Sequence, residues 1–465
     1  MGARTATNWV GNSTPHFAIY TTDQNDGARD IVERLETARL FLSHTAWASQ
    51  NISQRVDILA FGSGQEYSSY GLNASVYAFY QRTRQGDYVV IRDINPEHFP
   101  IVVHEYTHFV AEHSGLKLPL WLNEGLADFY STVQSRRSQV LLGEAPEGRE
   151  ATLNHSRWIP WVTLTAVDRD SPYYRQSDKM LLFYAQSWAL VHMLAMHADY
   201  IDGFPKFLEA VSAGATTDAA LQAVYHKDLQ QVGREAEEYV RSRHDEARLV
   251  NLDVRPSDLR TQPITEAQRA AEFALADVLA ANPQTLSEAK RRLETLTARY
   301  PGDSSSEELL GFLAMSGGNQ RDAEQHFAHA VQTNTQDPEV LFRLAHLKIA
   351  GEGPTEEVVD LLQRVLAADS NHYNARLELG FAAARMGKFD VAVQALEKIS
   401  KPKAEHTYVV SYTLAYCLVE LHQGNKARMY AEQARKVADG GKNEEQVAGL
   451  LRYIDQELPV EVASH

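Results

Sequence analysis

Residues 101–130 read IVVHEYTHFVAEHSGLKLPLWLNEGLADFY, and the interpretation of the whole chain starts from this stretch. It contains an HExxH motif, His104-Glu105-Tyr106-Thr107-His108, within a segment that has the apolar spacing of a helix. Residues four apart share a helical face, so both imidazoles can reach one metal ion. Glu105, next to the first histidine, can then act on a water molecule at that ion.

A carboxylate in the following segment completes a set of metal-binding side chains. Glu124 lies within WLNEGLAD, a second segment of helical character. Two imidazoles and one carboxylate leave one position of a tetrahedral Zn²⁺ open, as in catalytic zinc sites, whereas structural zinc sites are closed. The alternative for either histidine alone is a hydrogen-bonded core residue, but the combination with Glu105 and Glu124 favours a metal centre.

The sequence HEYTH followed by NEGLAD resembles the gluzincin branch of zinc peptidases, in particular bacterial peptidase-MA-like domains that carry HExxH and LPxWLxEGLA. The resemblance implies an α+β fold of the thermolysin and aminopeptidase type that hydrolyses peptide bonds, with endo- and exo-action both open. It implies Zn²⁺ as the cofactor, His104, His108 and Glu124 as its ligands, and Glu105 as the general base. Such domains are often followed by tetratricopeptide repeats (TPRs).

Two further site residues are expected from the same resemblance. Asp128 follows Glu124 by one helical turn, and in the thermolysin-like pattern this aspartate supports the first ligand, His104. The alternative for Asp128 is a solvated acidic residue. Tyr184 is the candidate donor to the developing oxyanion, with a core position as its alternative. Four residues compete with it for that role: Tyr173, Tyr174, His192 and His197.

The composition limits the function classes. With 465 residues, of which 44% are hydrophobic, the chain can form two or three domains with their own cores. Its 45 basic and 61 acidic residues give a net charge of −16 without a basic run, so neither nucleic acid nor an anionic membrane is an expected partner. Cys417 is the sole cysteine, which excludes an intrachain disulfide. No apolar run is long enough for a transmembrane segment.

The beginning of the chain bears on its location. No apolar signal-peptide core precedes the first expected strand, and Met1-Gly2-Ala3 stands shortly before that strand. We expect a periplasmic or secreted protein whose leader is missing from this chain. A cytoplasmic location is the alternative.

A small sheet is expected ahead of the metal-binding helix, over residues 14–95. Four stretches predict strands, at 16–22, 55–61, 75–80 and 88–92. Either 75–80 or 88–92 is the candidate edge strand, along which an extended peptide can pair through its backbone. An ordinary core strand is the alternative.

This sheet and a helical zinc-site subdomain at 96–250 are expected to form one catalytic domain, residues 1–250. Within it, the polar stretch 143–157 is expected to be an exposed loop near the cleft. Residues 251–264, which contain two prolines, are the expected linker to the remainder of the chain.

From residue 265 onwards, small residues recur with a fixed period. One series recurs at intervals of 34 or 35 residues: Ala289, Ala323, Val358, Ala392 and Ala427. A second series has the same spacing: Gly311, Ala345, Gly380 and Ala415. This period is typical of TPRs, in which small residues let paired helices approach closely. We therefore predict an all-α superhelix over 265–465 that ends in a capping helix near 443–457.

The combined prediction is a zinc metallopeptidase of gluzincin type followed by a TPR superhelix that recruits substrate or a partner protein. The concave face of such an array commonly holds a peptide, although the array can also support the catalytic domain or mediate self-association. The alternative function is a non-catalytic or regulatory peptidase-like TPR scaffold for protein–protein interaction. The complete set of ligands and base favours the enzyme.

Overall fold

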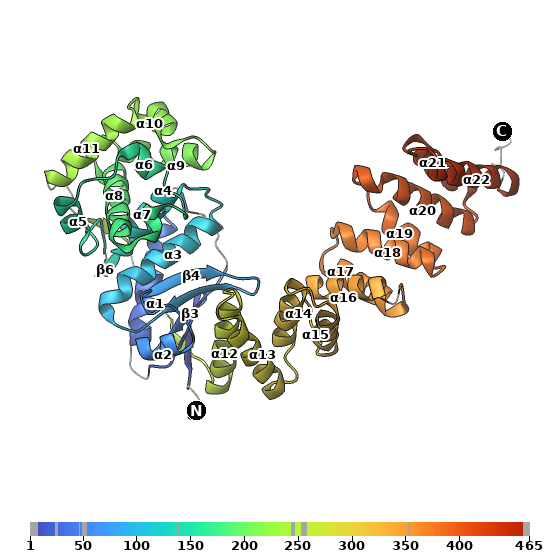
Figure 1. Cartoon of the computed structure of the whole chain (residues 1–465), viewed down its shortest axis with the longest axis horizontal. Helices are drawn as coiled ribbons and strands as arrows, with labels where there is room; N and C mark the ends of the chain where they lie inside the picture. Colours follow the sequence, from blue (N-terminus) through green and yellow to red (C-terminus); the bar gives the residue numbers. More distant parts are fainter. Residues whose placement is uncertain are drawn as a thin grey trace. The chain divides into compact units, whose positions relative to one another are not determined.

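The computed structural model describes residues 8–23, 27–45, 47–48, 54–137, 139–242, 247–252, 258–351 and 353–458. By its internal contacts the chain divides into two compact units, Met1–Arg292 and Leu293–His465. The described residues are mostly helical, and a small sheet region lies in the first unit (Figure 1).

The main sheet of the first unit has the strand order β4-β5-β3-β2-β1-β9. The central strands β2, β3 and β5 are parallel, whereas β1, β4 and β9 pair antiparallel with their neighbours. The strands are β1 (Val10–Ser13), β2 (Phe17–Thr21), β3 (Val56–Ala60), β4 (Ala78–Arg82), β5 (Asp87–Ile91) and β9 (Arg260–Thr261). The stretch expected as a strand at 88–92 is β5, which lies inside the sheet, so it is not an edge. The edge is β4.

Helices cover both faces of this sheet. Phe17 and Ile19 of β2 belong to a core shared with α1 (Gly27–Leu42) and α3 (Phe99–His113). The alternate residues Ala18 and Tyr20 belong to a second core, shared with α12 (Ile264–Ala280). Because side chains alternate along a strand, a strand that is buried on both faces needs apolar residues at every position, and β2 is buried throughout.

Helix α12 lies where the sequence predicts the start of the repeat array, yet it packs on the sheet. Its Ala271 and Leu275 are fully buried in the core that also contains Leu59 of β3. The boundary between the two units falls within α13 (Leu286–Arg299), beyond the predicted linker at 251–264. Part of that linker, 253–257, lies outside the described residues.

Backbone pairing explains why the predicted linker does not separate the units. Strand β8 (Arg248–Asn251) pairs with β7 (Gln139–Leu142), and β9 pairs with β1. Both pairings join residues that are distant in sequence and hold the chain on the first unit. The second, antiparallel sheet has the order β6-β7-β8, with β6 at Gln134–Arg136.

The helices beside the sheets carry the candidate site. They are α2 (Gly64–Ser69), η1 (Pro96–His98), α4 (Leu120–Ser131), α5 (Arg149–His155), α6 (Trp161–Thr165), α7 (Pro172–Arg175), α8 (Ser177–Met196), η2 (Ile201–Gly203), α9 (Phe204–Ser212), α10 (Thr217–Tyr225) and α11 (Leu229–Arg241). The stretch expected to be an exposed loop at 143–157 contains α5. Leu153 of this helix belongs to the core of the first unit and is 3% exposed.

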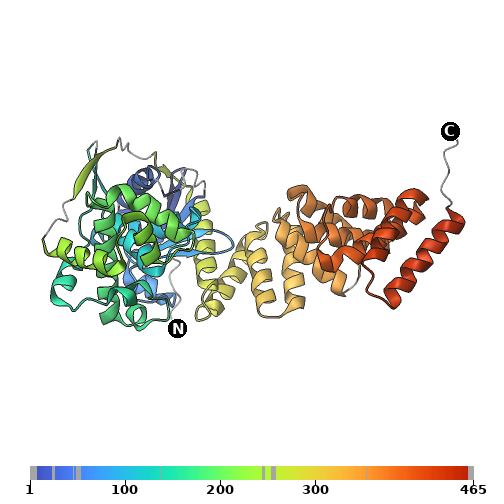
Figure 2. The same ribbon diagram turned by 90° about the horizontal axis from the view of Figure 1, so that it is seen from above.

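The second unit is a series of antiparallel helical hairpins (Figure 2). Beyond α13 they are α14 (Ser305–Ser316), α15 (Gln320–Gln332), α16 (Pro338–Gly351), α17 (Glu356–Ala368), α18 (Tyr373–Arg385), α19 (Phe389–Glu397), η3 (Ala404–His406), α20 (Thr407–Glu420), α21 (Gly424–Lys436) and α22 (Lys442–Glu457). A Cβ at Gly311 would lie 2.4 Å from the ring of Phe327, and one at Gly380 would lie 2.3 Å from Leu396. The recurring small residues therefore permit close helix crossings.

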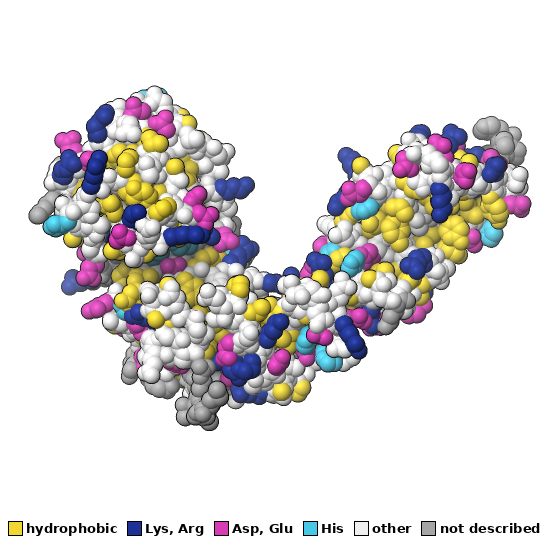
Figure 3. Space-filling model, in the orientation of Figure 1, with side chains coloured by type: hydrophobic (Ala, Val, Ile, Leu, Met, Phe, Trp, Pro, Cys, Tyr) yellow, Lys and Arg dark blue, Asp and Glu magenta, His cyan; other side chains and the backbone are white. Residues whose placement is uncertain are grey.

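The visible face of each unit carries charged side chains of both signs (Figure 3). On the face shown in Figure 3, Lys and Arg side chains are scattered among Asp and Glu within each unit. The chain as a whole carries a net charge of −16.

Candidate metal centre

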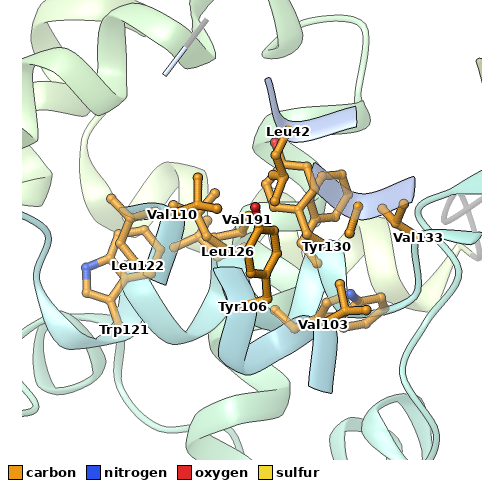
Figure 4. Close-up of a cluster of buried hydrophobic side chains, with 14 of the residues drawn as sticks. Leu42, Val103, Tyr106, Val110, Trp121, Leu122, Leu126, Tyr130, Val133 and Val191 are labelled. Atoms are coloured by element: carbon orange, nitrogen blue, oxygen red, sulfur yellow. The ribbon is translucent and has the colours of Figure 1, made fainter. Parts of the chain in front are cut away.

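The two helices that carry the HExxH and NEGLAD motifs are fixed by a shared apolar core. Val103 and Val110 of α3 lie in one buried cluster with Leu122 and Leu126 of α4 (Figure 4). Helix α3 starts with a proline in its first turn, which suits that position because the proline lacks an N–H. Packing of these apolar faces places the polar faces of α3 and α4 next to each other.

Helix α4 is also held closely against α8, at Gly125. A Cβ at this position would lie 2.6 Å from the carbonyl oxygen of Ser187 and 2.7 Å from a methyl group of Val191. Only glycine permits this distance between the helices. Because Gly125 follows Glu124 directly, the α4–α8 contact sets the position of the Glu124 carboxylate.

The side chains of His104, His108 and Glu124 converge on one point. The two Nε2 atoms lie 3.1 Å apart, and Glu124 Oε2 lies 3.3 Å from His104 Nε2 and 3.4 Å from His108 Nε2. Tetrahedral zinc with bonds of about 2.0–2.2 Å has its ligand atoms about 3.3–3.6 Å apart. The two distances from Glu124 fall within this range and the distance between the two Nε2 atoms is slightly shorter, so these residues could hold one such ion after a small separation of the imidazoles.

Asp128 contacts the ring nitrogen of His104 that does not face the convergence point. Its Oδ1 lies 2.9 Å from His104 Nδ1, and its side chain is almost completely buried. A proton on Nδ1, donated to Asp128, leaves the lone pair of Nε2 directed at the convergence point. His108 differs, since its buried Nδ1 has no hydrogen-bond partner in the described part of the chain.

The same contacts set the charges of the site. Burial alone would raise the pKa of Glu124, but hydrogen bonds with His104 and His108 outweigh burial and lower it. Burial would likewise lower the pKa of His104, but the hydrogen bonds with Asp128 and Glu124 raise it instead. Burial would raise the pKa of Asp128 as well, but the charge of Arg149 and the hydrogen bond with His104 lower it.

Glu105 lies beside this centre and touches the edge strand. The backbone N–H of Tyr80 in β4 donates a 2.8 Å hydrogen bond to Glu105 Oε2. Burial raises the pKa of the Glu105 carboxyl, and the neighbouring histidines, His104 and His108, act in the opposite direction. The net pKa shift is upwards, towards the range that suits a general base near neutral pH.

A cavity of about 560 Å³ opens onto the centre. His104 and Glu105 line it together with Tyr184, Arg149 and Leu181. Leu181 is 52% exposed, so the cavity offers apolar surface next to the polar centre. A concave site with apolar walls and a few convergent polar groups is the usual form of a ligand pocket.

Two of the five tyrosine and histidine candidates lie at the centre. The ring of Tyr184 is 6.1 Å from that of His104, and the Tyr174 hydroxyl donates a 3.2 Å hydrogen bond to Glu124 Oε1. His192 lies elsewhere, fully buried between Gly143 and Tyr239. Tyr173 and His197 contact other residues: Lys179 Nζ lies 5.9 Å from the centroid of the Tyr173 ring, and the His197 ring lies 6.1 Å from that of Tyr200.

Sequence reasoning missed two groups that touch the site residues. Arg149 forms an ion pair with Asp128, with its Nε 2.7 Å from Oδ2. The second is the backbone N–H of Tyr80, which binds Glu105. Arg149 falls in a stretch that looks like a polar loop, and a backbone donor carries no side-chain signal. The one sequence signal for Arg149 was its positive charge within residues 143–157, which were expected to lie near the cleft.

Comparison with known proteins finds a family match for part of the first unit. Residues 98–242 match the profile of the Peptidase MA superfamily. This range includes α3, α4 and α8, which carry the ligand set and Tyr184. No curated protein sequence matches the chain.

Solved structures similar to the chain include TPR proteins. YrrB, described as a TPR protein with an unusual peptide-binding site, is 15% identical with a TM-score of 0.32, covering 40% of this chain and 95% of its own. The MamA protein is 20% identical with a TM-score of 0.29, covering 39% of this chain and 96% of its own. The chain therefore contains a segment that matches the Peptidase MA superfamily, followed by a series of helical hairpins.

None of the helices in the described residues has both the length and the apolar character needed to cross a membrane.

Proposed function

We propose that this chain is a zinc-dependent peptidase of gluzincin type, and that its TPR-like repeats recruit the substrate or a partner protein. His104, His108 and Glu124 are the proposed zinc ligands. The observation that carries the proposal is the spacing of their three donor atoms, 3.1 to 3.4 Å apart. The match of residues 98–242 to the Peptidase MA superfamily supports it independently.

Bound zinc would supply a water molecule of lowered pKa and would polarise the carbonyl group of the peptide. Glu105 would take the proton of the attacking water and pass it to the leaving nitrogen. Asp128 would keep His104 in the tautomer that directs Nε2 at the ion. Tyr184 would donate a hydrogen bond to the negative charge that develops on the carbonyl oxygen.

The edge strand β4 is the proposed binding surface for the peptide backbone. An extended peptide can add to an exposed sheet edge through main-chain hydrogen bonds. Tyr80 donates its N–H to Glu105 from this strand, so a peptide paired along β4 would lie next to the general base. Such pairing recognises backbone and leaves side-chain selection to the cavity walls.

The test compares Glu105→Gln with the wild-type protein. We expect both to bind one zinc ion per chain, and we expect the variant to lose at least about 10²-fold in cleavage of a peptide library. Glu112→Gln is the matched control, because Glu112 lies on the same helix in an ion pair with Arg82 and is 45% exposed. Absence of bound zinc, or unchanged cleavage by the variant, would overturn the proposal.

A non-catalytic scaffold is the second candidate, because the repeats form a compact unit of their own, Leu293–His465. A wild-type protein that binds zinc and cleaves no peptide in the library would favour the scaffold. Cleavage that depends on Glu105 would exclude it.

A further inference from the structure

The Asp128 carboxylate is held on both sides. Arg149 approaches it with two donors, Nε at 2.7 Å from Oδ2 and Nη2 at 3.2 Å from Oδ1. His104 Nδ1 lies 2.9 Å from Oδ1. The Arg149 side chain is 18% exposed and that of Asp128 is 4% exposed, so water can replace little of this contact. A bidentate guanidinium–carboxylate pair fixes the plane of the carboxylate as well as its position.

The segment that carries Arg149 is fastened to the body of the first unit. The Gly143 carbonyl accepts a hydrogen bond at 2.8 Å from His192 Nε2, and the Glu144 carbonyl accepts one at 2.8 Å from Thr132 Oγ1. Further along, the buried Gln186 side chain bonds both the N–H and the carbonyl of Ile159. Arg149 is therefore presented at a fixed place between two anchored ends.

The backbone just before Arg149 is also specialised. Gly148 has φ +78°, in the left-handed region that glycine adopts without strain. It precedes the first turn of α5, so the turn at Gly148 aims Arg149 at Asp128. The guanidinium also lies over the Tyr184 ring, with its carbon atom 5.3 Å from the ring centroid.

We propose that Arg149 is a positioning residue of the metal centre, which acts through Asp128 to fix the orientation and tautomer of His104 and so raises the affinity for zinc. This inference rests on the proposed function. Arg149 holds the buried carboxylate in one orientation through its two donors. The ordered carboxylate accepts the Nδ1 proton of His104 and leaves Nε2 free for the ion.

The chemistry of the guanidinium predicts what a substitution will do. A methionine fills the volume of the arginine stem but has no donor, so the Asp128 carboxylate would lose its bidentate partner and turn towards other hydrogen bonds. A lysine supplies a positive charge from a single ammonium group and cannot hold the plane of the carboxylate. Arg149→Lys should therefore recover only part of what Arg149→Met loses.

The experiment measures the zinc affinity of the full-length chain by competition with a chromogenic chelator. Loss of an outer partner of a metal ligand typically costs about 10–100-fold in metal affinity, and we expect Arg149→Met to fall in this range. Arg149→Lys should lie between Arg149→Met and the wild type. The visible spectrum of the Co²⁺-substituted protein should change in Arg149→Met, because the geometry around His104 changes.

A double-mutant cycle shows whether the effect passes through Asp128. If it does, Asp128→Asn combined with Arg149→Met should bind zinc no more weakly than Asp128→Asn alone, because the residues act as one unit. Arg157→Met is the matched control. Arg157 is exposed on the same segment, and its removal should leave zinc affinity unchanged.

Each other outcome overturns the inference. Wild-type zinc affinity in Arg149→Met, with a changed KM or kcat, would make Arg149 a substrate contact. If the loss of zinc-binding free energy in the double mutant equals the sum of the two single losses, Arg149 does not act through Asp128. If Arg149→Met does not fold, the cycle is run with Arg149→Lys in its place: the zinc affinities of Arg149→Lys, Asp128→Asn and their double mutant are compared in the same way. A wild-type protein without zinc affinity would overturn the proposed function itself, whereas the preceding outcomes leave the proposed function standing.

Discussion

The close contact between α4 and α8 predicts that Gly125→Ala will destabilise the first unit and weaken the metal centre. The new Cβ would lie 2.6 Å from the Ser187 carbonyl oxygen and 2.9 Å from its carbon. Both are backbone atoms, so rotation of a side chain cannot relieve the contact. A normal separation requires the two helices to move apart by about 0.5–1 Å, and Glu124 moves with α4.

The magnitude follows from two opposing terms. Alanine is better than glycine in a helix interior by about 1 kcal/mol. Overpacking typically costs about 1–3 kcal/mol, and the rigid backbone contact places this site towards the upper end. We therefore expect a net loss of about 1–2 kcal/mol in the free energy of unfolding. Zinc affinity should fall as well, because ligand positions must be held within about 0.5 Å.

The assay is urea unfolding in EDTA, followed by tryptophan fluorescence. All 6 tryptophans lie between Trp9 and Trp188, so their fluorescence reports on the first unit alone. Gly449→Ala is the control: it lies within α22, and its Cβ would meet nothing within 4 Å. It should leave the tryptophan transition in place and stabilise the second unit by about 1 kcal/mol. A Gly125→Ala protein as stable as the wild type, or more so, would refute the reasoning.

Three further predictions concern the first unit and use the same fluorescence assay. Burial would raise the pKa of Glu36, but hydrogen bonds from Arg39, Thr14 and His16 outweigh it and lower the pKa below its usual 4.5. Glu36→Gln should therefore lose about 1–2 kcal/mol in the free energy of unfolding at pH 7. This difference from the wild type should vanish as the pH falls through the lowered pKa, and a difference that stays constant with pH would contradict the prediction. Burial raises the pKa of Asp277 in the folded protein above its usual 3.8. The free energy of unfolding of the wild type should therefore fall as the pH rises from 3.8 through the raised pKa. Asp277→Asn should unfold at a higher urea concentration than the wild type at pH 7 and lose this advantage near pH 4. Zinc at 100 times its Kd should stabilise the wild-type transition by about 2.7 kcal/mol, and EDTA should abolish the gain.

The parts of the site that sequence reasoning placed together are those that one helix carries at fixed spacing. His104 and His108 are four apart on α3, and Glu124 and Asp128 are four apart on α4, so helical geometry alone puts each pair on one face. The roles assigned to them stay predictions until metal binding is measured. Periodicity also predicted the repeats, since Gly311 and Gly380 recur where helices cross.

The parts that could not be predicted depend on contacts between residues far apart in sequence. Arg149 meets Asp128 only because β7 and α5 return to α4. Tyr80 reaches Glu105 through its backbone N–H, for which residue type carries no information. The apolar face of α12 fits a repeat helix or a sheet cover equally well, and its partner depends on how β1, β3 and β5 assemble.

Charge balance links these contacts to the proposed cofactor. Three carboxylates, those of Glu105, Glu124 and Asp128, surround the centre, and Arg149 neutralises one of them. With both imidazoles neutral, the cluster carries a formal charge of −2. Buried charges are costly unless they are paired or coordinate metals. Protonation of His104 would offset one of these negative charges, whereas a divalent cation among the three donor atoms would offset both, so the proposed zinc ion balances the charge of the cluster.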